Sequence, residues 1–216
     1  MSTKTSSTDA KSELPRWNLD DLYVGPESPT IQSDIERIRK MADDFAGTYR
    51  GKVSALSATE FATAIVGYED FVHIMHKLIS YAQLLYAADA GNADIAKFYQ
   101  SITEQITDIS TQTIFFELEI NNTDDATFDA WFNDQGVAHY GPWLHDVRLN
   151  RPHQLSDDLE QVLHQKSVTG RSAWSRLFDE TMVDMRIKVK GEPKKMTLAD
   201  TLDRLSDSDG KIRKRA

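Results

Sequence analysis

Residues 57–122 read SATEFATAIVGYEDFVHIMHKLISYAQLLYAADAGNADIAKFYQSITEQITDISTQTIFFELEINN, and this stretch decides the fold of the 216-residue chain. It contains no proline, and its apolar residues recur every three or four positions, as on one face of a helix. Ser57 and Glu60 have the spacing of a capping box, in which each side chain satisfies a free backbone N–H of the first turn. The pattern predicts a long helix from residue 58 onward.

A glycine and an asparagine divide this stretch near its middle. Gly91 can adopt the left-handed conformation that ends many helices, and Asn92 is a favourable N-cap for the next one. We therefore predict an antiparallel hairpin that turns at Gly91-Asn92, with Gly91 at positive φ. Each helix is expected to be about 30 residues or about 45 Å long, and the second to end at Asn121-Asn122. Burial in the protein core is enough to explain the apolar stripes of both helices, and no cofactor is needed.

Further helices are predicted on both sides of the hairpin. Before it, Ser28 and Pro29 have the character of an N-cap and a first helical residue, and apolar residues at helical spacing continue to Tyr49. After it, shorter helices are expected over residues 123–132, 143–149, 156–165 and 170–182.

The period then changes. Met185, Ile187 and Val189 alternate with basic residues, which predicts a strand, and residues 195–197 can return as a second strand before Thr197 caps another helix. The predicted fold class is thus mainly α, with a long antiparallel helical hairpin, shorter helices and a small two-stranded β-ribbon near residues 184–198.

The last ten residues, 207–216, are unusual. Asp207-Ser208-Asp209 has the character of an N-cap region, but only seven residues follow, four of them basic. Cations in a first turn oppose the helix dipole, and so short a helix is unfavourable alone. We interpret the segment as an element cut by the end of the chain. A frayed basic tail is the alternative, and a nucleic-acid or localisation patch is a weaker one.

Composition excludes several classes of protein. The 25 Lys and Arg against 34 Asp and Glu give a net charge of −9, which disfavours nucleic-acid binding. No apolar run reaches the roughly 18 to 20 residues of a membrane span. Residues 1–14 lack the apolar segment of a secretory signal and are predicted to be a disordered tail. Together with the absence of cysteine, this indicates a cytoplasmic location.

The strongest chemical constellation is Glu69, His73 and His76, which share one face of the predicted helix and could hold a divalent metal. The histidines are three apart rather than four, and no glutamate follows the first, so the general base of a zinc protease is missing. We favour polar residues that face solvent or pack in the hairpin, with a structural or adventitious metal as the alternative. No catalytic, cofactor-binding or metal-binding residue is assigned.

Other polar residues are interpreted as structural. His153 precedes a helix cap and is expected to fix the turn. Arg171, Arg176, Asp179 and Glu180 are expected to form a solvated face with ion pairs, although an arginine near a groove could hold a peptide carboxylate. Most of the acidic pairs are interpreted as helix caps. These pairs are Asp20-Asp21, Asp43-Asp44, Asp124-Asp125 and Asp157-Asp158.

Four local patterns occur in the order and spacing of a known family. They are WNLDDLY at residues 17–23, YRGK at 49–52, PHQLS at 152–156 and GRSAWSRLFDE at 170–180. In these patterns the chain resembles the N-terminal region of the oligoendopeptidase F family, zinc metallopeptidases of the thimet-oligopeptidase type. The resemblance implies a cytoplasmic, helical endopeptidase that hydrolyses short peptides in a channel between lobes.

The resemblance also divides the chain. It implies a helical hairpin region at 15–120, a second helical region with the ribbon at 121–206, and the start of a truncated peptidase domain at 207–216. In the family, two histidines of a His-Glu-x-x-His motif and a later glutamate hold zinc, and no such motif occurs in residues 1–216. The chain is therefore expected to form the channel wall, and to be inactive and without zinc when alone.

Two functional alternatives remain. Either oligopeptide substrates reach this wall through a missing catalytic lobe, or the chain is a free-standing helical module that binds peptides or proteins or serves as a scaffold. The wall alternative predicts exposed apolar surface and self-association through the final third of the chain. The expected contributors are Trp174 to Phe178, Met185, Ile187, Val189, Leu198, Leu202 and Leu205.

Overall fold

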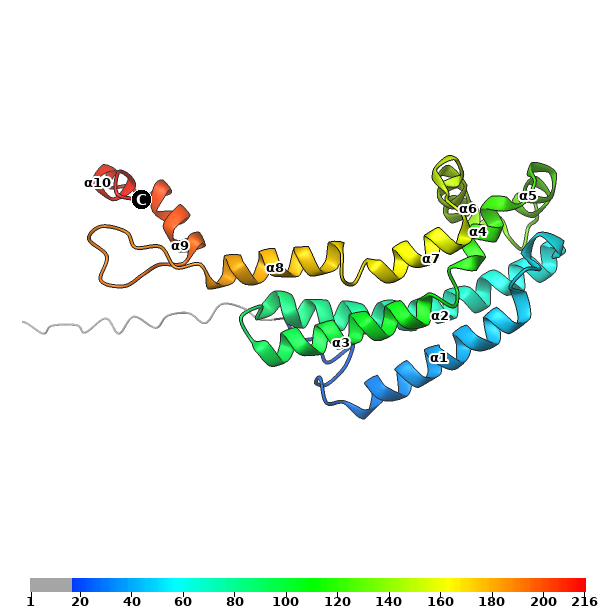
Figure 1. The fold of residues 1–216 in the computed structure, drawn as a ribbon, viewed down its shortest axis with the longest axis horizontal. Coiled ribbons are helices and arrows are strands. Elements are labelled where there is room, and N and C mark those ends of the chain that lie inside the picture. The colour runs from blue at the N-terminus through cyan, green and yellow to red at the C-terminus, as the bar shows by residue number, and fades with distance from the viewer. Residues whose placement is uncertain (1–16) are drawn as a thin grey trace, which may run out of the picture.

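The computed structural model describes residues 17–216, so the tail predicted at residues 1–14 lies outside the described part. The helices form an elongated stack (Figure 1). Helix α1 (Pro29–Tyr49) packs against α2 (Ala58–Ala88) and α3 (Ala93–Ser110), which form the predicted hairpin. Helices α7 (Asp157–Lys166) and α8 (Arg171–Asp184) run end to end along the other side of that hairpin (Figure 1).

The shorter helices gather at the two ends of the stack (Figure 1). Helices α4 (Phe115–Asn122), α5 (Asp125–Phe132) and α6 (Gly141–Leu149) lie where α2 begins. Helices α9 (Leu198–Asp203) and α10 (Gly210–Arg213) lie at the opposite end, beyond α8. Short 3₁₀ turns cover Val53–Ala55, Ala138–Tyr140, Arg151–His153 and Arg204–Ser206.

The local signals of the hairpin are confirmed, apart from the conformation of its glycine. The capping box is present, with the Glu60 N–H donating to Ser57 Oγ at 3.3 Å and the Ser57 N–H donating to Glu60 Oε2 at 2.9 Å. The Asn92 side chain accepts the Asp94 N–H at 3.0 Å. The prediction of positive φ at Gly91 is wrong. Asp89 leaves the helical conformation first, and its carbonyl accepts the Asn92 N–H at 3.1 Å, so the turn needs no left-handed residue.

The second helix of the hairpin is shorter than predicted. It ends at Ser110, and α4 begins at Phe115 after a turn. In this turn the Thr111 hydroxyl donates to the Thr107 carbonyl at 2.7 Å, and the Thr113 hydroxyl donates to the Ser110 carbonyl at 3.1 Å. Such side-chain bonds compete with the helical ladder. The resulting bend redirects α4 into a separate part of the core.

The predicted two-stranded ribbon is wrong. Within residues 17–216 no strand forms, and the segment contains one antiparallel bridge between Ile187 and Met196, joined by two backbone hydrogen bonds of 2.8 Å. The loop inside this bridge carries Lys188, Lys190 and the Lys194-Lys195 pair. Like charges on facing strands oppose pairing, and a lone hairpin is marginal in water.

The buried core consists of two clusters that leave α7 and α8 outside. The first joins α1, α2 and α3 around Ile38, Leu78 and Ile109. The second joins the start of α2 to α4, α5 and α6, where Phe61 stacks on Trp131 with ring centroids 3.9 Å apart. Neither α7 nor α8 contributes a buried side chain. No helix among the described residues is both long and apolar enough to cross a bilayer.

Candidate functional site

A groove of about 730 Å³ lies between α8 and the tip of the α2–α3 hairpin. This volume is within the range of small-molecule and peptide pockets, roughly 300 to 1,000 Å³. Small and aromatic side chains of the hairpin form one wall, including Tyr86, Ala87 and Tyr99. The polar side of α8 forms the other wall, with Arg171, Ser172, Ser175, Arg176 and Asp179.

Two stacked tyrosines form part of the hairpin wall. The rings of Tyr86 and Tyr99 lie 5.1 Å apart with an angle of 19° between their planes. Tyr86 is 5% exposed, and its buried hydroxyl has no hydrogen-bond partner in the described part of the chain. Burial raises the pKa of Tyr86, and the nearby carboxylates of Glu180 and Asp179 raise it further. The hairpin wall therefore contains a buried hydroxyl for which residues 17–216 provide no hydrogen-bond partner.

The charged residues of α8 are only partly paired with one another. Arg176 Nε lies 3.7 Å from Glu180 Oε1, which is the expected ion pair on one helix face. Arg171 and Asp179 also line the groove, but neither takes part in an ion pair among residues 17–216. The predicted solvated face is thus also a groove wall, on which Arg171 and Asp179 are exposed and have no ion-pair partner within residues 17–216.

The opposite face of α8 is apolar and exposed. Trp174, Leu177 and Phe178 have 71%, 51% and 63% of their surface exposed. Residues three and four apart share a helix face, whereas Ser172 and Arg176, each two positions from Trp174, lie nearly opposite. From Arg171 to Asp179, helix α8 is thus amphipathic in reverse, because its polar side faces the hairpin and its apolar side faces away, whereas Met182 and Val183 near its end also line the groove.

The apolar exposure continues along α7 and α9. Leu159, Val162 and Leu163 of α7 are all exposed. Most of the residues predicted to expose apolar surface do so, whereas Val189 is buried, contrary to prediction, and Ile187 and Leu198 are half-buried. The exposed members are Trp174, Leu177, Phe178, Met185, Leu202 and Leu205.

The candidate metal ligands do not form a site. Glu69, His73 and His76 are all exposed on α2. The Glu69 carboxylate instead accepts the Tyr140 hydroxyl at 2.6 Å, and this hydrogen bond raises the pKa of Tyr140 to about 12. Within residues 17–216, no three His, Asp or Glu side chains converge to hold a metal ion. The side chains of this region therefore do not fit a zinc centre.

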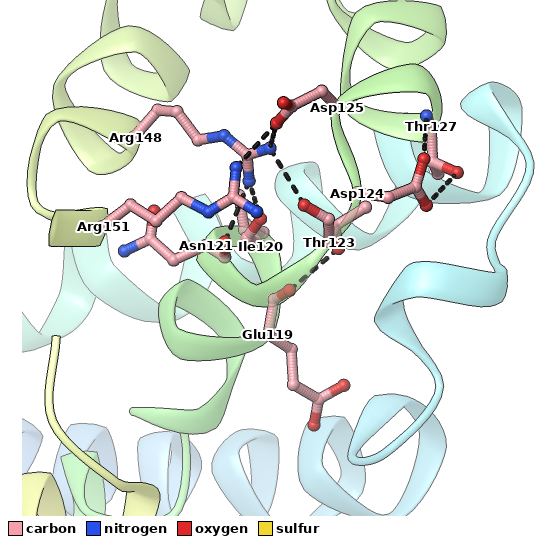
Figure 2. A network of polar contacts seen from close by, with 9 residues as sticks. All are labelled: Glu119, Ile120, Asn121, Thr123, Asp124, Asp125, Thr127, Arg148 and Arg151. Carbon is pink, nitrogen blue, oxygen red and sulfur yellow. Dashed lines mark hydrogen bonds and ion pairs between the residues drawn. The ribbon is translucent and has the colours of Figure 1, made fainter.

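A partly buried arginine that the sequence reasoning missed fastens α4 and α6 together (Figure 2). The Arg148 guanidinium donates to the carbonyls of Ile120, Asn121 and Thr123 at 2.9, 3.0 and 2.9 Å. It also donates to Asp125 Oδ1 at 2.7 Å. Arg148 satisfies the carbonyls at the end of α4, a role that basic residues near helix ends often take. Its distance in sequence from α4 explains why no local pattern indicated it.

The two residues of the neighbouring acidic pair, Asp124 and Asp125, have different structural roles. Asp124 caps α5 by accepting the Thr127 N–H at 3.0 Å, as predicted. Asp125 instead binds two arginines, and hydrogen bonds from Arg151 and then Arg148 lower its pKa.

The remaining polar predictions have mixed outcomes. The pair Asp157-Asp158 lies in the first turn of α7, where acidic residues are favourable. The cap interpretation is wrong for Asp43-Asp44, which lie inside α1. The side chain of His153 is exposed in a 3₁₀ turn, and the backbone N–H of His153 donates to the Asn150 carbonyl at 2.9 Å.

Another histidine, His164, was not singled out from the sequence and contacts the hairpin. The Nε2 atom of His164 on α7 lies 2.8 Å from the Ser110 hydroxyl on α3. Burial lowers the pKa of His164. This contact holds α7 against the hairpin at the point where the groove begins.

Comparisons with known proteins agree in pointing to one family. The family described as Oligopeptidase F matches residues 119–187. The "Oligoendopeptidase F homolog" of Borreliella burgdorferi is 27% identical over 206 residues, which is 94% of this chain and 34% of that protein. The crystal structure of oligoendopeptidase-F from Enterococcus faecium has a TM-score of 0.74 at 19% identity, covering 86% of this chain and 36% of that one. The chain thus spans about a third of the length of the relatives that it matches.

Proposed function

We propose that this chain, which is similar in sequence and fold to the N-terminal region of the oligoendopeptidase F family, forms a channel wall of a zinc oligoendopeptidase that hydrolyses short peptides. In this proposal the zinc and its catalytic histidines and glutamates lie in a peptidase lobe outside the matched third. The wall contributes shape and contacts but no bond-breaking chemistry. The cytoplasmic location inferred from the sequence is part of the same proposal.

The reversed amphipathicity of α8 is the observation that carries this proposal. A soluble helix normally turns its apolar stripe toward the core. Here Trp174, Leu177 and Phe178 point away from the hairpin, and α7 adds three more exposed aliphatic residues. Full burial of one such side chain is worth roughly 1.5 to 3 kcal/mol. Contiguous exposed apolar surface usually marks an interface, and a peptidase lobe is the partner that the family similarity supports.

The same face supports a second association. In the absence of a peptidase lobe, the apolar stripe is available to a second copy of this chain. We therefore propose weak self-association through α7 and α8 when the chain is isolated.

A co-expression experiment tests the proposed function. The transcript is read beyond the Ala216 codon, and any downstream segment with a His-Glu-x-x-His motif is expressed together with the tagged chain. We expect the two parts to co-purify and to hydrolyse a quenched fluorescent peptide. The double substitution Trp174→Glu and Phe178→Glu should prevent co-purification. Leu149→Glu, which changes a similarly exposed apolar residue on α6, is the control and should leave co-purification intact.

Two results would favour the alternative of a free-standing binding module. One is a transcript with no such downstream segment. The other is a downstream segment that neither co-purifies with the chain nor gains activity from it. The groove between α8 and the hairpin is the feature that would then carry the function.

A further inference from the structure

The exposed apolar residues on the outward face of α7 and α8 are placed symmetrically about Gly170. The two helices lie end to end (Figure 1), and Gly170 lies between them. Leu163 and Leu177 each lie seven residues from this glycine. Val162 and Phe178 each lie eight residues from it. All four of these side chains are more than half exposed, so the apolar stripe has two matching halves.

The symmetry extends to the centre and to the ends of the stripe. Leu155 and Met185 are both exposed, and each lies fifteen residues from Gly170. Nearer the centre, Lys166 and Trp174 are also exposed, and each lies four residues from it. A lysine ammonium group is attracted to the face of an indole ring. A second copy in the opposite direction would therefore offer a suitable partner to each of these residues.

Such a pattern is what a twofold interface requires. In a twofold dimer the same surface of both copies meets, so that residue i contacts residue j of the partner and residue j contacts residue i. With antiparallel helices and the axis beside Gly170, Leu163 meets the partner's Leu177. Val162 meets the partner's Phe178 in the same way. Apolar side chains therefore contact apolar side chains over most of the stripe.

Charges at the two ends of this face favour the antiparallel direction. Asp157, Asp158 and Glu160 lie in the first turn of α7, whereas the segment that follows α8 carries Arg186 and Lys188. None of these five residues forms an ion pair within residues 17–216. Antiparallel pairing places the acidic end of each copy beside the basic end of the other. Parallel pairing would place like charges together, which is unfavourable.

We propose that two copies of the isolated chain pair through α7 and α8 as an antiparallel dimer, with the twofold axis beside Gly170. This inference rests on the proposed function, because the second copy occupies the outward face that a peptidase lobe covers in that proposal. The two partners use one stripe and therefore exclude each other. Binding of a peptidase lobe separates the two copies.

Disulfide cross-linking tests the direction and the register of the pairing. The chain contains no cysteine, so engineered thiols are the only ones present. Val162→Cys and Phe178→Cys are purified separately, mixed and oxidised. A disulfide requires Cα atoms within about 7 Å. In the proposed dimer residue 162 meets residue 178 of the partner, whereas the two copies of residue 162 lie about 24 Å apart. We expect the mixture to cross-link at least tenfold more than either variant alone.

Analytical ultracentrifugation measures the strength of the pairing. We expect a dimer whose fraction rises with concentration. Phe178→Glu should raise the dimer dissociation constant at least tenfold, a difference of about 1.4 kcal/mol, because the substitution places two charges in the twofold interface. Leu149→Glu, at a similarly exposed apolar residue on α6, is the control and should leave the dissociation constant unchanged. Circular dichroism of each variant checks that the helices are intact.

Three results would overturn the proposal. They are a chain that stays monomeric up to about 1 mM, where association is worth only about 4 kcal/mol, cross-linking of Val162→Cys with itself as efficient as that of the mixture, and cross-linking that persists when a peptidase segment is bound. A monomeric chain that binds a peptidase segment would contradict the dimer and leave the channel wall intact. A dimer that cross-links as expected but binds no peptidase segment would support the pairing and contradict the channel wall.

Discussion

Replacing Arg148 with glutamine should strongly destabilise the end of the molecule that contains α4, α5 and α6. The Arg148 side chain is 16% exposed and donates to three backbone carbonyls at the end of α4 (Figure 2). The residues that carry these carbonyls, Ile120, Asn121 and Thr123, are themselves buried. Water therefore has little access to replace the lost donors.

The expected loss can be worked from these contacts. A hydrogen bond that involves a charged group contributes about 1.5 to 3 kcal/mol, and a buried acceptor left unpaired costs about 1 to 3 kcal/mol. The three bonds share one guanidinium, and glutamine can keep one of them, so the contributions do not add fully. Arg148 also lies over the Phe128 ring at 4.4 Å, and this contact is lost too. We expect Arg148→Gln to lower the free energy of unfolding by about 3 kcal/mol.

Urea unfolding followed by circular dichroism measures this loss. Arg151→Gln is the matched control, because Arg151 binds the same Asp125 oxygen at 2.6 Å but is 42% exposed and holds no carbonyl of α4. We expect a much smaller change for the control. If the two variants lose equal stability, or if Arg148→Gln loses less than about 1 kcal/mol, the assignment of Arg148 as the fastening residue is refuted.

Three further outcomes follow from the structure. Gly51→Ala should lower the free energy of unfolding by about 1 kcal/mol, because Gly51 has a φ of +74°. Gly91→Ala should change the free energy of unfolding by less than about 0.5 kcal/mol, because Gly91 is not left-handed. Urea unfolding of the two variants measures both changes. Because the pKa of His164 is lowered in the folded chain, the contribution of neutral His164 to stability is complete above pH 6.5, the ordinary pKa of histidine. This contribution is lost as the pH falls below 6.5. Thermal melting of the chain should therefore show greater acid sensitivity than melting of His164→Gln, and equal sensitivity would contradict this. Binding of a hydrophobic dye should fall in Trp174→Glu but not in Leu149→Glu, and unchanged binding in Trp174→Glu would argue against a continuous apolar face.

The elements that the sequence predicted well are those with strong local signals. Ser57 with Glu60, and Asn92 with its following helix, are caps that act within a few residues, and both form as predicted. The helix break after Ser110 was missed because apolar periodicity continues through it, while the buried hydroxyls of Thr111 and Thr113 decide the geometry. The alternation at residues 185–189 predicted a strand. A strand needs a second strand to pair with, and repulsion between the lysines on the two segments weakens that pairing.

The candidate site depended on contacts distant in sequence and was only partly predictable. Arg171 and Asp179 drew attention as charges on one helix, yet their position against Tyr86 follows from how α8 lies along the hairpin. The exposure of Trp174 and Phe178 was predicted from the family resemblance, which implies that a partner lobe is missing from this chain. Which of the two faces turns toward the hairpin required the structure.

The central claim is that the outward face of α7 and α8 is an interface. Hydrogen exchange of the backbone amides in α8 tests this claim most directly. In the isolated chain, amides of α8 should exchange much faster than those in the middle of α2, because α8 has no buried side chain. Addition of the co-expressed peptidase segment should slow exchange in α8 and leave α1 unchanged. Exchange in α8 that is already as slow as in α2, or that does not change when the peptidase segment binds, would contradict the account.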